Sequence, residues 1–159
     1  QGIQLEHVLA TGPNRIFAEA DAIYHAVVNL ITNAIEACAE RKKNEDDASY
    51  QPRILVEVQA NRTHVETMVV DNGPGMDSLQ CDRVFIAFES TKGARGSGLG
   101  LAVSQKIVGE HGGTILLKSE LGKGSCFTIQ LPADQDSDVN RSTQEHTLAT
   151  QPKDLRPIN

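Results

Sequence analysis

A glycine-rich segment in the second half of the chain is the first candidate for chemistry. Residues 93–101 read Gly-Ala-Arg-Gly-Ser-Gly-Leu-Gly-Leu and run into a stretch whose apolar spacing predicts a helix. Backbone N–H groups of such a loop and of a helix start can close around an anion, and Lys92 and Arg95 add cations there. Polyphosphate is therefore the ligand suggested, with a plain glycine linker as the alternative. The spacing matches neither a Rossmann fingerprint nor a P-loop.

An aspartate at the end of a predicted strand is the second candidate. Asp71-Asn72-Gly73-Pro74-Gly75 follows the apolar residues 68–70 directly. A carboxylate in this place can accept a hydrogen bond from an exocyclic amine such as adenine N6, and the two glycines allow a flat ligand to approach closely. The alternative is an ordinary turn, because Asn-Gly and Pro-Gly are common turn dipeptides.

Two asparagines on a predicted helix are the third candidate. Asn29 and Asn33 are four residues apart, so they lie on one face, at the border of the apolar stripe. Asparagine is unfavourable inside a helix and needs hydrogen-bond partners there. An amide oxygen aimed at a cleft can ligate Mg²⁺. The alternative is that both amides only bond to neighbouring loops.

One long helix must position the asparagines. Its apolar face recurs at helical spacing, as Ile23, Ala26, Val27, Leu30, Ile31, Ala34, Ile35 and Cys38. Asp21 lies where an N-cap is expected, and the polar residues 41–51 predict a loop after the helix. Further helices are expected over residues 78–88 and 99–111, the latter with Leu99, Ala102, Val103 and Ile107 on its apolar side.

Strands are indicated by alternation with period two. Two antiparallel hairpins are predicted, one from residues 54–58 and 65–69 with a turn at 60–62, the other from residues 114–119 and 125–131 with a turn at 121–124. Residues 3–9 and 15–18 could add short strands. Helices grouped with such a sheet predict an α+β fold, a two-layer α/β sandwich.

Composition limits the classes of function. The 159 residues include 39% hydrophobic residues, 4% aromatic residues and no Trp, and the net charge is −6. An acidic chain argues against a nucleic-acid or anionic-membrane partner, and no apolar run is long enough to span a bilayer. Cys38, Cys81 and Cys126 are odd in number and widely spaced, which indicates buried reduced thiols in a cytoplasmic protein.

The two ends of the chain differ from its middle. Residues 133–159 carry few apolar side chains among polar residues and two further prolines, so we expect a disordered tail after a folded domain of residues 1–132. The first residue is Gln1, not Met, which suggests a piece of a longer protein.

The three candidate sites and a pair of phenylalanines follow one another in a known order. Asn29-x-x-x-Asn33-Ala34, Asp71-x-Gly73-x-Gly75, Phe85-x-x-Phe88 and Gly96-x-Gly98-x-Gly100 together resemble the N, G1, F and G2 boxes of sensor histidine kinases. The resemblance is to their catalytic ATP-binding domain, within the gyrase/Hsp90/MutL-like ATPase superfamily, and covers about residues 1–132. It implies a Bergerat-type fold, with a mixed, mostly antiparallel sheet and helices on one face.

The resemblance also implies roles for individual residues. Asp71 should accept from adenine N6, and Asn33 should hold Mg²⁺ with Asn29 supporting it, while Asn29 and Lys92 are the expected catalytic residues. Phe85 and Phe88 resemble the anchors of an ATP lid. The full expected nucleotide-binding set is Asn29, Asn33, Asp71, Gly73, Gly75, Phe85, Phe88, Thr91, Lys92, Arg95, Gly96, Ser97, Gly98, Leu99 and Gly100.

The residue at position 29 separates branches of this superfamily. By resemblance, hydrolysing members and serine kinases carry Glu four residues before the magnesium asparagine, where it acts as a base. Asn29 cannot accept a proton at neutral pH, and neither Glu36 nor His25 stands at that position. Transfer to an imidazole, which is nucleophilic when neutral, suits such a site. A hydrolysing or serine-kinase relative, and a nucleotide-binding regulator without transfer activity, remain as alternatives.

The acceptor histidine of such a kinase is expected elsewhere. None of the five histidines is followed by the acidic residue of an H-E/D-x-x-x-P-like motif; they are His7, His25, His64, His111 and His146. The resemblance therefore implies ATP and Mg²⁺ as cofactors and a helical dimerisation and phosphoacceptor domain as partner, with a response regulator downstream. We expect a cytoplasmic domain that is monomeric in isolation, in a homodimeric parent whose membrane attachment is open.

Overall fold

The computed structural model describes residues 2–9, 15–44, 49–87 and 98–134. These residues form eight helices and strands: β1 Gln4–Val8, α1 Ala20–Asn44, β2 Arg53–Ala60, β3 His64–Asp71, α2 Ser78–Arg83, α3 Gly100–Glu110, β4 Thr114–Glu120 and β5 Gly124–Pro132. The five strands form a single sheet in the order β1-β2-β3-β5-β4. β1 runs parallel to β2, and every other neighbouring pair is antiparallel.

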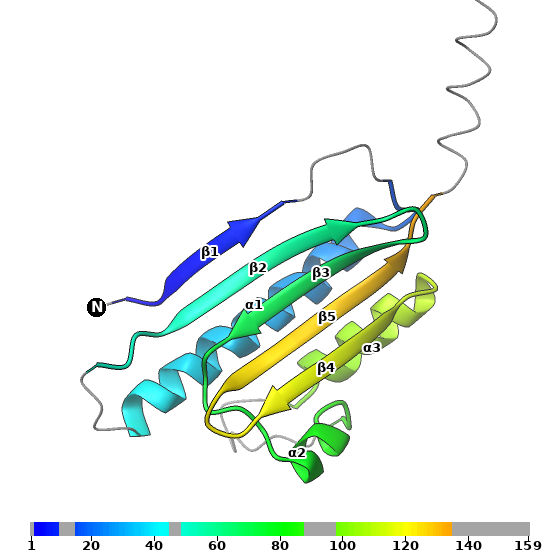
Figure 1. Ribbon diagram of the computed structural model, residues 1–159. Helices are drawn as coiled ribbons and strands as arrows, with labels where there is room; N and C mark the ends of the chain where they lie inside the picture. The colour runs from blue at the N-terminus through cyan, green and yellow to red at the C-terminus, as the bar shows by residue number, and fades with distance from the viewer. Residues whose placement is uncertain (1, 10–14, 45–48, 88–97, 135–159) are drawn as a thin grey trace, which may run out of the picture.

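The helices lie on one face of this sheet, so the domain has two layers (Figure 1). α1 packs most extensively against α3 and, on the sheet, chiefly against β3, while α3 also packs against β4 and β5. The predicted α+β sandwich with a mixed, mostly antiparallel sheet is therefore confirmed. Both predicted hairpins are present, as β2–β3 and β4–β5.

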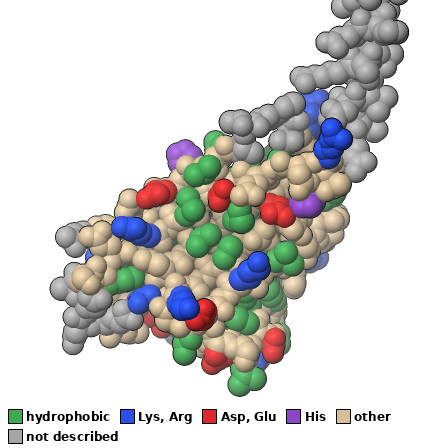
Figure 2. Space-filling view, viewed as in Figure 1, with side chains coloured by type: hydrophobic (Ala, Val, Ile, Leu, Met, Phe, Trp, Pro, Cys, Tyr) green, Lys and Arg blue, Asp and Glu red, His purple; other side chains and the backbone are tan. Residues whose placement is uncertain are grey.

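The core between the layers is built from aliphatic side chains, one cysteine and one phenylalanine. Its buried members are Ala26, Leu30, Ala34, Cys38, Ile54, Val69, Val108, Ile115, Phe127, Ile129 and Leu131. The residues on β3 and β5 alternate inward and outward, which places Val69 and Asp71 on the same inward side. The other face of the sheet is not covered by the helices, and hydrophobic side chains gather at its centre with charged ones around them (Figure 2).

Helix α1 is longer than the sequence pattern predicts. It continues through Arg41, Lys42 and Lys43 to Asn44, so the predicted loop at residues 41–51 begins too early. Basic residues in the last turn of a helix are stabilised by its dipole, which explains the extension. Asp21 lies inside the first turn and is not the N-cap, and Ile35 is 41% exposed, outside the buried stripe.

Helix α2 is shorter than predicted and ends at Arg83. It begins with a capping box, in which Asp77 Oδ1 accepts from Gln80 N at 2.8 Å and Gln80 Oε1 accepts from Asp77 N at 3.0 Å. In α3, the fully buried residues are Ser104 and Val108, whereas Val103, which we expected on the apolar face, is 46% exposed.

The remaining predictions concern cysteines and chain ends. All three cysteines are free, but only Cys38 is buried, and Cys81 and Cys126 are partly exposed. The expected strand at residues 15–18 is only a bridge between Ile16 and Ala133. Residues 135–159, the bulk of the predicted tail, lie outside the described residues. Among the described helices, none has the length and apolar character that crossing a membrane requires.

Candidate functional site

Asp71 is the last residue of β3 and is 6% exposed. Its Oδ1 accepts a hydrogen bond from Gly73 N at 2.7 Å, and the backbone N–H of Ser125, its partner on β5, also donates to the carboxyl group. Burial raises the pKa of Asp71 above the ordinary value, and the two N–H donors counteract part of that rise. A buried carboxylate held in a fixed orientation is suited to accept from a ligand amine.

The glycines after Asp71 are required by close packing. A Cβ on Gly73 would lie 2.8 Å from Asp71 Oδ1 and 2.9 Å from Ala37 Cβ. Gly75 has φ of +67°, and a Cβ there would overlap the carbonyl oxygen of Glu120. The loop that follows the aspartate is therefore pressed against α1 on one side and the β4–β5 turn on the other.

Four residues form a single row along α1, because they recur every four residues. They are Asn29, Asn33, Ala37 and Arg41. Ala37 and Arg41 lie against the loop that follows Asp71, whereas Asn29 contacts α3. The helical rise places Ala37 about 12 Å from Asn29 along the axis, with Asn33 midway. The row therefore links the Asp71 loop to the start of α3.

Asn29 connects the two long helices. Its Nδ2 donates to Gly100 O at 3.4 Å and to Ser104 Oγ at 3.2 Å. α3 begins at Gly100 after Leu99, a residue whose side chain cannot cap the first N–H groups, and Gly98 has φ of +64°. A helix N-terminus without a side-chain cap is suited to bind an anion.

Asn33 is half-buried, and within the described parts of the chain its amide has no hydrogen-bond partner. No cluster of three or more His, Cys, Asp or Glu side chains in those parts could hold a metal ion. Mg²⁺ often takes only one or two protein ligands and completes its shell with phosphate oxygens and water. A single amide oxygen on α1, between the Asp71 loop and the N-terminus of α3, fits that ion.

The structure describes nine of the fifteen residues in the predicted nucleotide site. Phe85 lies in an edge-to-face contact with Phe127, with ring centroids 6.3 Å apart, and so anchors the chain after α2 on the core. The other six lie outside the described residues: Phe88, Thr91, Lys92, Arg95, Gly96 and Ser97.

Several residues at this site were not predicted from the sequence. Arg41, Tyr50 and Asn72 form a polar cluster behind the Asp71 loop, and Ser125 is a buried hydroxyl beside Asp71. The only sequence signal for Ser125 is its place at the start of a predicted strand. Arg41 carries none, because it falls in a segment that reads as a polar loop.

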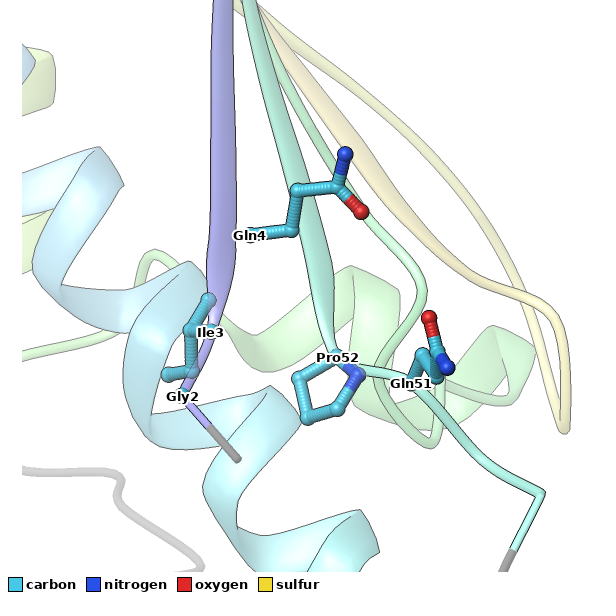
Figure 3. A pocket seen from close by; sticks show the side chains of 5 residues that line it. All are labelled: Gly2, Ile3, Gln4, Gln51 and Pro52. Carbon is cyan, nitrogen blue, oxygen red and sulfur yellow. The ribbon is translucent and has the colours of Figure 1, made fainter.

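A surface hollow of about 310 Å³ lies elsewhere, between β1 and the start of β2 (Figure 3). Gly2, Ile3, Gln4, Gln51 and Pro52 line it. It contains no charged or nucleophilic side chain among these residues, so it offers neither a phosphate site nor a catalytic group.

Comparison with known proteins identifies the family. Residues 18–135 match the model of the histidine kinase-, DNA gyrase B- and HSP90-like ATPases. The chain belongs to this family. Within it, the sensor histidine kinase ZraS of Escherichia coli K12 is 37% identical over 130 residues, which are 82% of this chain and 26% of that protein. Sporulation kinase E of Bacillus subtilis is 35% identical, over 81% of this chain and 16% of the kinase.

Solved structures of histidine kinases share the fold. The catalytic domain of ThkA matches with a TM-score of 0.68 and 27% identity, covering 84% of this chain and 81% of that one. Full-length ShkA in complex with AMPPNP matches with a TM-score of 0.68 and 26% identity, covering 83% of this chain and 26% of ShkA. The predicted histidine kinase catalytic domain is thus confirmed as the enzyme class. The chain spans about a quarter of the length of ZraS and about a sixth of the length of sporulation kinase E.

Proposed function

We propose that this histidine kinase domain binds Mg·ATP and donates the γ-phosphoryl group to a histidine on a helical phosphoacceptor domain of its parent kinase. The observation that carries the proposal is the row of residues along α1. It joins a buried carboxylate with two close-packed glycines at one end to an uncapped helix N-terminus at the other. The binding of AMPPNP by ShkA supports a triphosphate nucleotide as the ligand.

Each end of the site recognises one part of the nucleotide. Asp71 accepts a hydrogen bond from adenine N6, and the loop at Gly73 and Gly75 receives the flat base. The first N–H groups of α3 bind the phosphates, together with Lys92 and the glycines of the segment 88–97, which lies outside the described residues. The buried state of Asp71 strengthens its hydrogen bond, because the local dielectric is low.

Asn33 and Asn29 serve the phosphate end. Asn33 is the protein ligand for Mg²⁺, which when bound neutralises the charge of the phosphates. Asn29 holds α1 to α3 by donating to a carbonyl and a hydroxyl oxygen. A carboxylate in its place would face that carbonyl oxygen. The Asn29 amide therefore has a positioning role and supplies no base.

The transfer step needs little from the protein beyond alignment. The lone pair of the neutral imidazole nitrogen forms the P–N bond, while the bond from the γ-phosphorus to the β–γ bridging oxygen breaks and ADP leaves with that electron pair. The phosphoimidazole then releases its extra proton to water. Positioning and charge neutralisation are the main demands of such a reaction.

The wider assembly follows from the same proposal. The acceptor domain would be helical and dimeric, a response regulator would take the phosphoryl group next, and this domain alone would be a monomer. Neither nucleic acid nor a membrane surface is a partner of the domain in this scheme, in keeping with its net charge of −6.

The test is incubation of the chain with γ-labelled ATP, Mg²⁺ and the phosphoacceptor domain of the parent kinase. We expect label on the acceptor that is lost in acid and kept in base, as phosphohistidine behaves, and no label with the Asp71→Asn variant. Acid-stable label would indicate a serine kinase. Rapid steady-state hydrolysis without the acceptor would indicate an ATPase, and nucleotide binding without transfer would indicate a regulator.

A further inference from the structure

A cation lies behind the loop that carries Asp71. Arg41, in the last turns of α1, donates from one Nη1 to three backbone carbonyls: Asn72 O at 3.0 Å, Gly73 O at 3.2 Å and Gly122 O at 3.0 Å. Its guanidinium stacks on the ring of Tyr50, 4.7 Å from the centroid. Three carbonyl oxygens that converge on one point repel each other, and a positive charge between them removes that repulsion.

These carbonyls belong to two loops that are far apart in the sequence. Asn72 and Gly73 follow β3, whereas Gly122 lies in the turn between β4 and β5. The two loops also meet through Gly122 N, which donates to Pro74 O at 2.6 Å. Just before the turn, Ser119 Oγ at the end of β4 accepts from Met76 N at 2.9 Å. Arg41 therefore joins three segments: the end of α1, the Asp71 loop and the β4–β5 turn.

Tyr50 contacts the same loop beside Arg41, at the same carbonyl oxygen of Asn72. Its hydroxyl is 3.1 Å from Asn72 O and 3.2 Å from Asn72 Oδ1. Burial raises the pKa of Tyr50 well above the ordinary range, and the hydrogen bond to Cys38 adds to that rise. The hydroxyl therefore stays a donor at physiological pH. Asn72 in turn accepts from Arg53 N at 2.8 Å and donates to Gln51 O at 2.8 Å.

We infer that Arg41, stacked on Tyr50, is a positioning residue for the base-binding end of the nucleotide site. The inference rests on the proposed function, because it takes Asp71 and Gly73 as the groups that meet the base. Arg41 contacts the backbone on the C-terminal side of Asp71, whose Oδ1 is oriented by Gly73 N. Without the guanidinium, the Asp71 loop and the β4–β5 turn would be held together less firmly. The orientation of the Asp71 carboxylate would then be less well fixed.

This role has a kinetic signature. Arg41 lies at the Asp71 loop end of the α1 row, two helical turns from Asn33, and its hydrogen bonds to Asn72, Gly73 and Gly122 are all at that end. Its removal should therefore raise KM for ATP and leave kcat at saturating ATP unchanged. The affinities for ATP and for ADP should fall by the same factor, because both nucleotides carry the same base.

The experiment is calorimetric titration of the 159-residue chain with ATP and with ADP, both with Mg²⁺, at a temperature where every variant is folded by circular dichroism. Arg41→Met keeps the length of the side chain but removes the donors and the charge, and we expect affinity about tenfold lower for both nucleotides. Arg41→Lys keeps a charge and three donors and should recover part of that loss. Arg62→Met, at an exposed arginine, is the matched control.

A second variant guards against failure to fold. Tyr50→Phe keeps the ring beneath Arg41 and removes only the hydroxyl, with its contacts to Asn72 and Cys38, so we expect about a two- to threefold loss of affinity for both nucleotides. Lower resistance to urea with unchanged affinity would overturn the inference, since it would make the cluster merely structural. A larger loss for ATP than for ADP would overturn it too.

Amide NMR spectra of the nucleotide-free chain keep this inference separate from the proposed function. With Arg41→Met we expect the largest shift changes at residues 72–76 and 121–124, and changes confined to the end of α1 would contradict the positioning role. If the wild-type chain bound neither nucleotide, the proposed function would fail. If it bound both and Arg41→Met bound them equally well, the inference alone would fail.

Discussion

Gly73 and Ala37 approach so closely that a single methyl group cannot fit between the Asp71 loop and α1. A Cβ on Gly73 would lie 2.9 Å from Ala37 Cβ and 2.8 Å from Asp71 Oδ1. The loop therefore packs directly against α1, and the carboxyl group of Asp71, which we assign to adenine recognition, lies beside this contact. Packing and nucleotide recognition are coupled at this point.

Gly73→Ala should therefore damage both stability and binding. We expect a loss of about 1–3 kcal/mol in the free energy of unfolding, as for other overpacked sites, and a much weaker affinity for ATP. Urea denaturation and calorimetry measure the two effects. Gly109→Ala is the control, because Gly109 lies in α3 with nothing within 4 Å of a Cβ, and it should gain about 0.5–1 kcal/mol. Wild-type affinity in Gly73→Ala would contradict the close approach.

The buried carboxyl group of Asp71 predicts a pH dependence of stability. Its pKa is raised by burial, so the folded protein holds this proton more tightly than the unfolded chain does. The free energy of unfolding of the wild type, measured relative to Asp71→Asn, should be highest below about pH 4, fall as the pH rises through the raised pKa, and then stay constant. Urea titrations of both proteins from pH 3.5 to 8 test this. A difference that grows with pH would mean that the pKa is lowered.

Asn33→Ala should separate metal binding from base binding. We expect the gain in ATP affinity that Mg²⁺ provides to shrink about tenfold, while affinity measured in EDTA changes little. Thr32→Ala, at an exposed neighbour on the same helix, should behave as the wild type. An undiminished effect of Mg²⁺ in Asn33→Ala would remove this residue from the metal site.

Asn29→Asp replaces a donor by an acceptor at the contact between α1 and α3. The carboxylate would face Gly100 O, so we expect a loss of about 1–3 kcal/mol in the free energy of unfolding together with slower phosphoryl transfer. The positions of Gly100 and Ser104 relative to Asn29 explain both effects. Transfer at the wild-type rate with unchanged stability would show that the donor function of Asn29 is dispensable.

Much of the fold could be predicted because its signals are local. The two hairpins follow from alternation in β2, β3, β4 and β5, and the buried stripe of α1 follows from helical spacing. The end of α1 could not be predicted from the sequence, since polar residues 41–44 are equally typical of a loop and of a helix end. On α3, Val103 was wrongly placed on the buried face and Ser104 was missed, because Ser104 is polar yet fully buried against Asn29.

The site, too, contains residues that local sequence signals reveal and residues that only the tertiary fold brings together. Asp71 and its glycines could be found from the sequence because a strand end, a carboxylate and two glycines are neighbours in the chain. The contact of Arg41 with Gly122 spans 81 residues and exists only through the tertiary fold. The same holds for Ser125, whose proximity to Asp71 depends on the register of β3 and β5.

Calorimetric titration of the chain with ATP in the presence of Mg²⁺ tests the central claim most directly. The account predicts saturable binding at one site per chain by the wild type and none by Asp71→Asn, whose amide would present its N–H groups to adenine N6. Equal affinity of the two proteins, or no binding by the wild type at millimolar ATP, would contradict it.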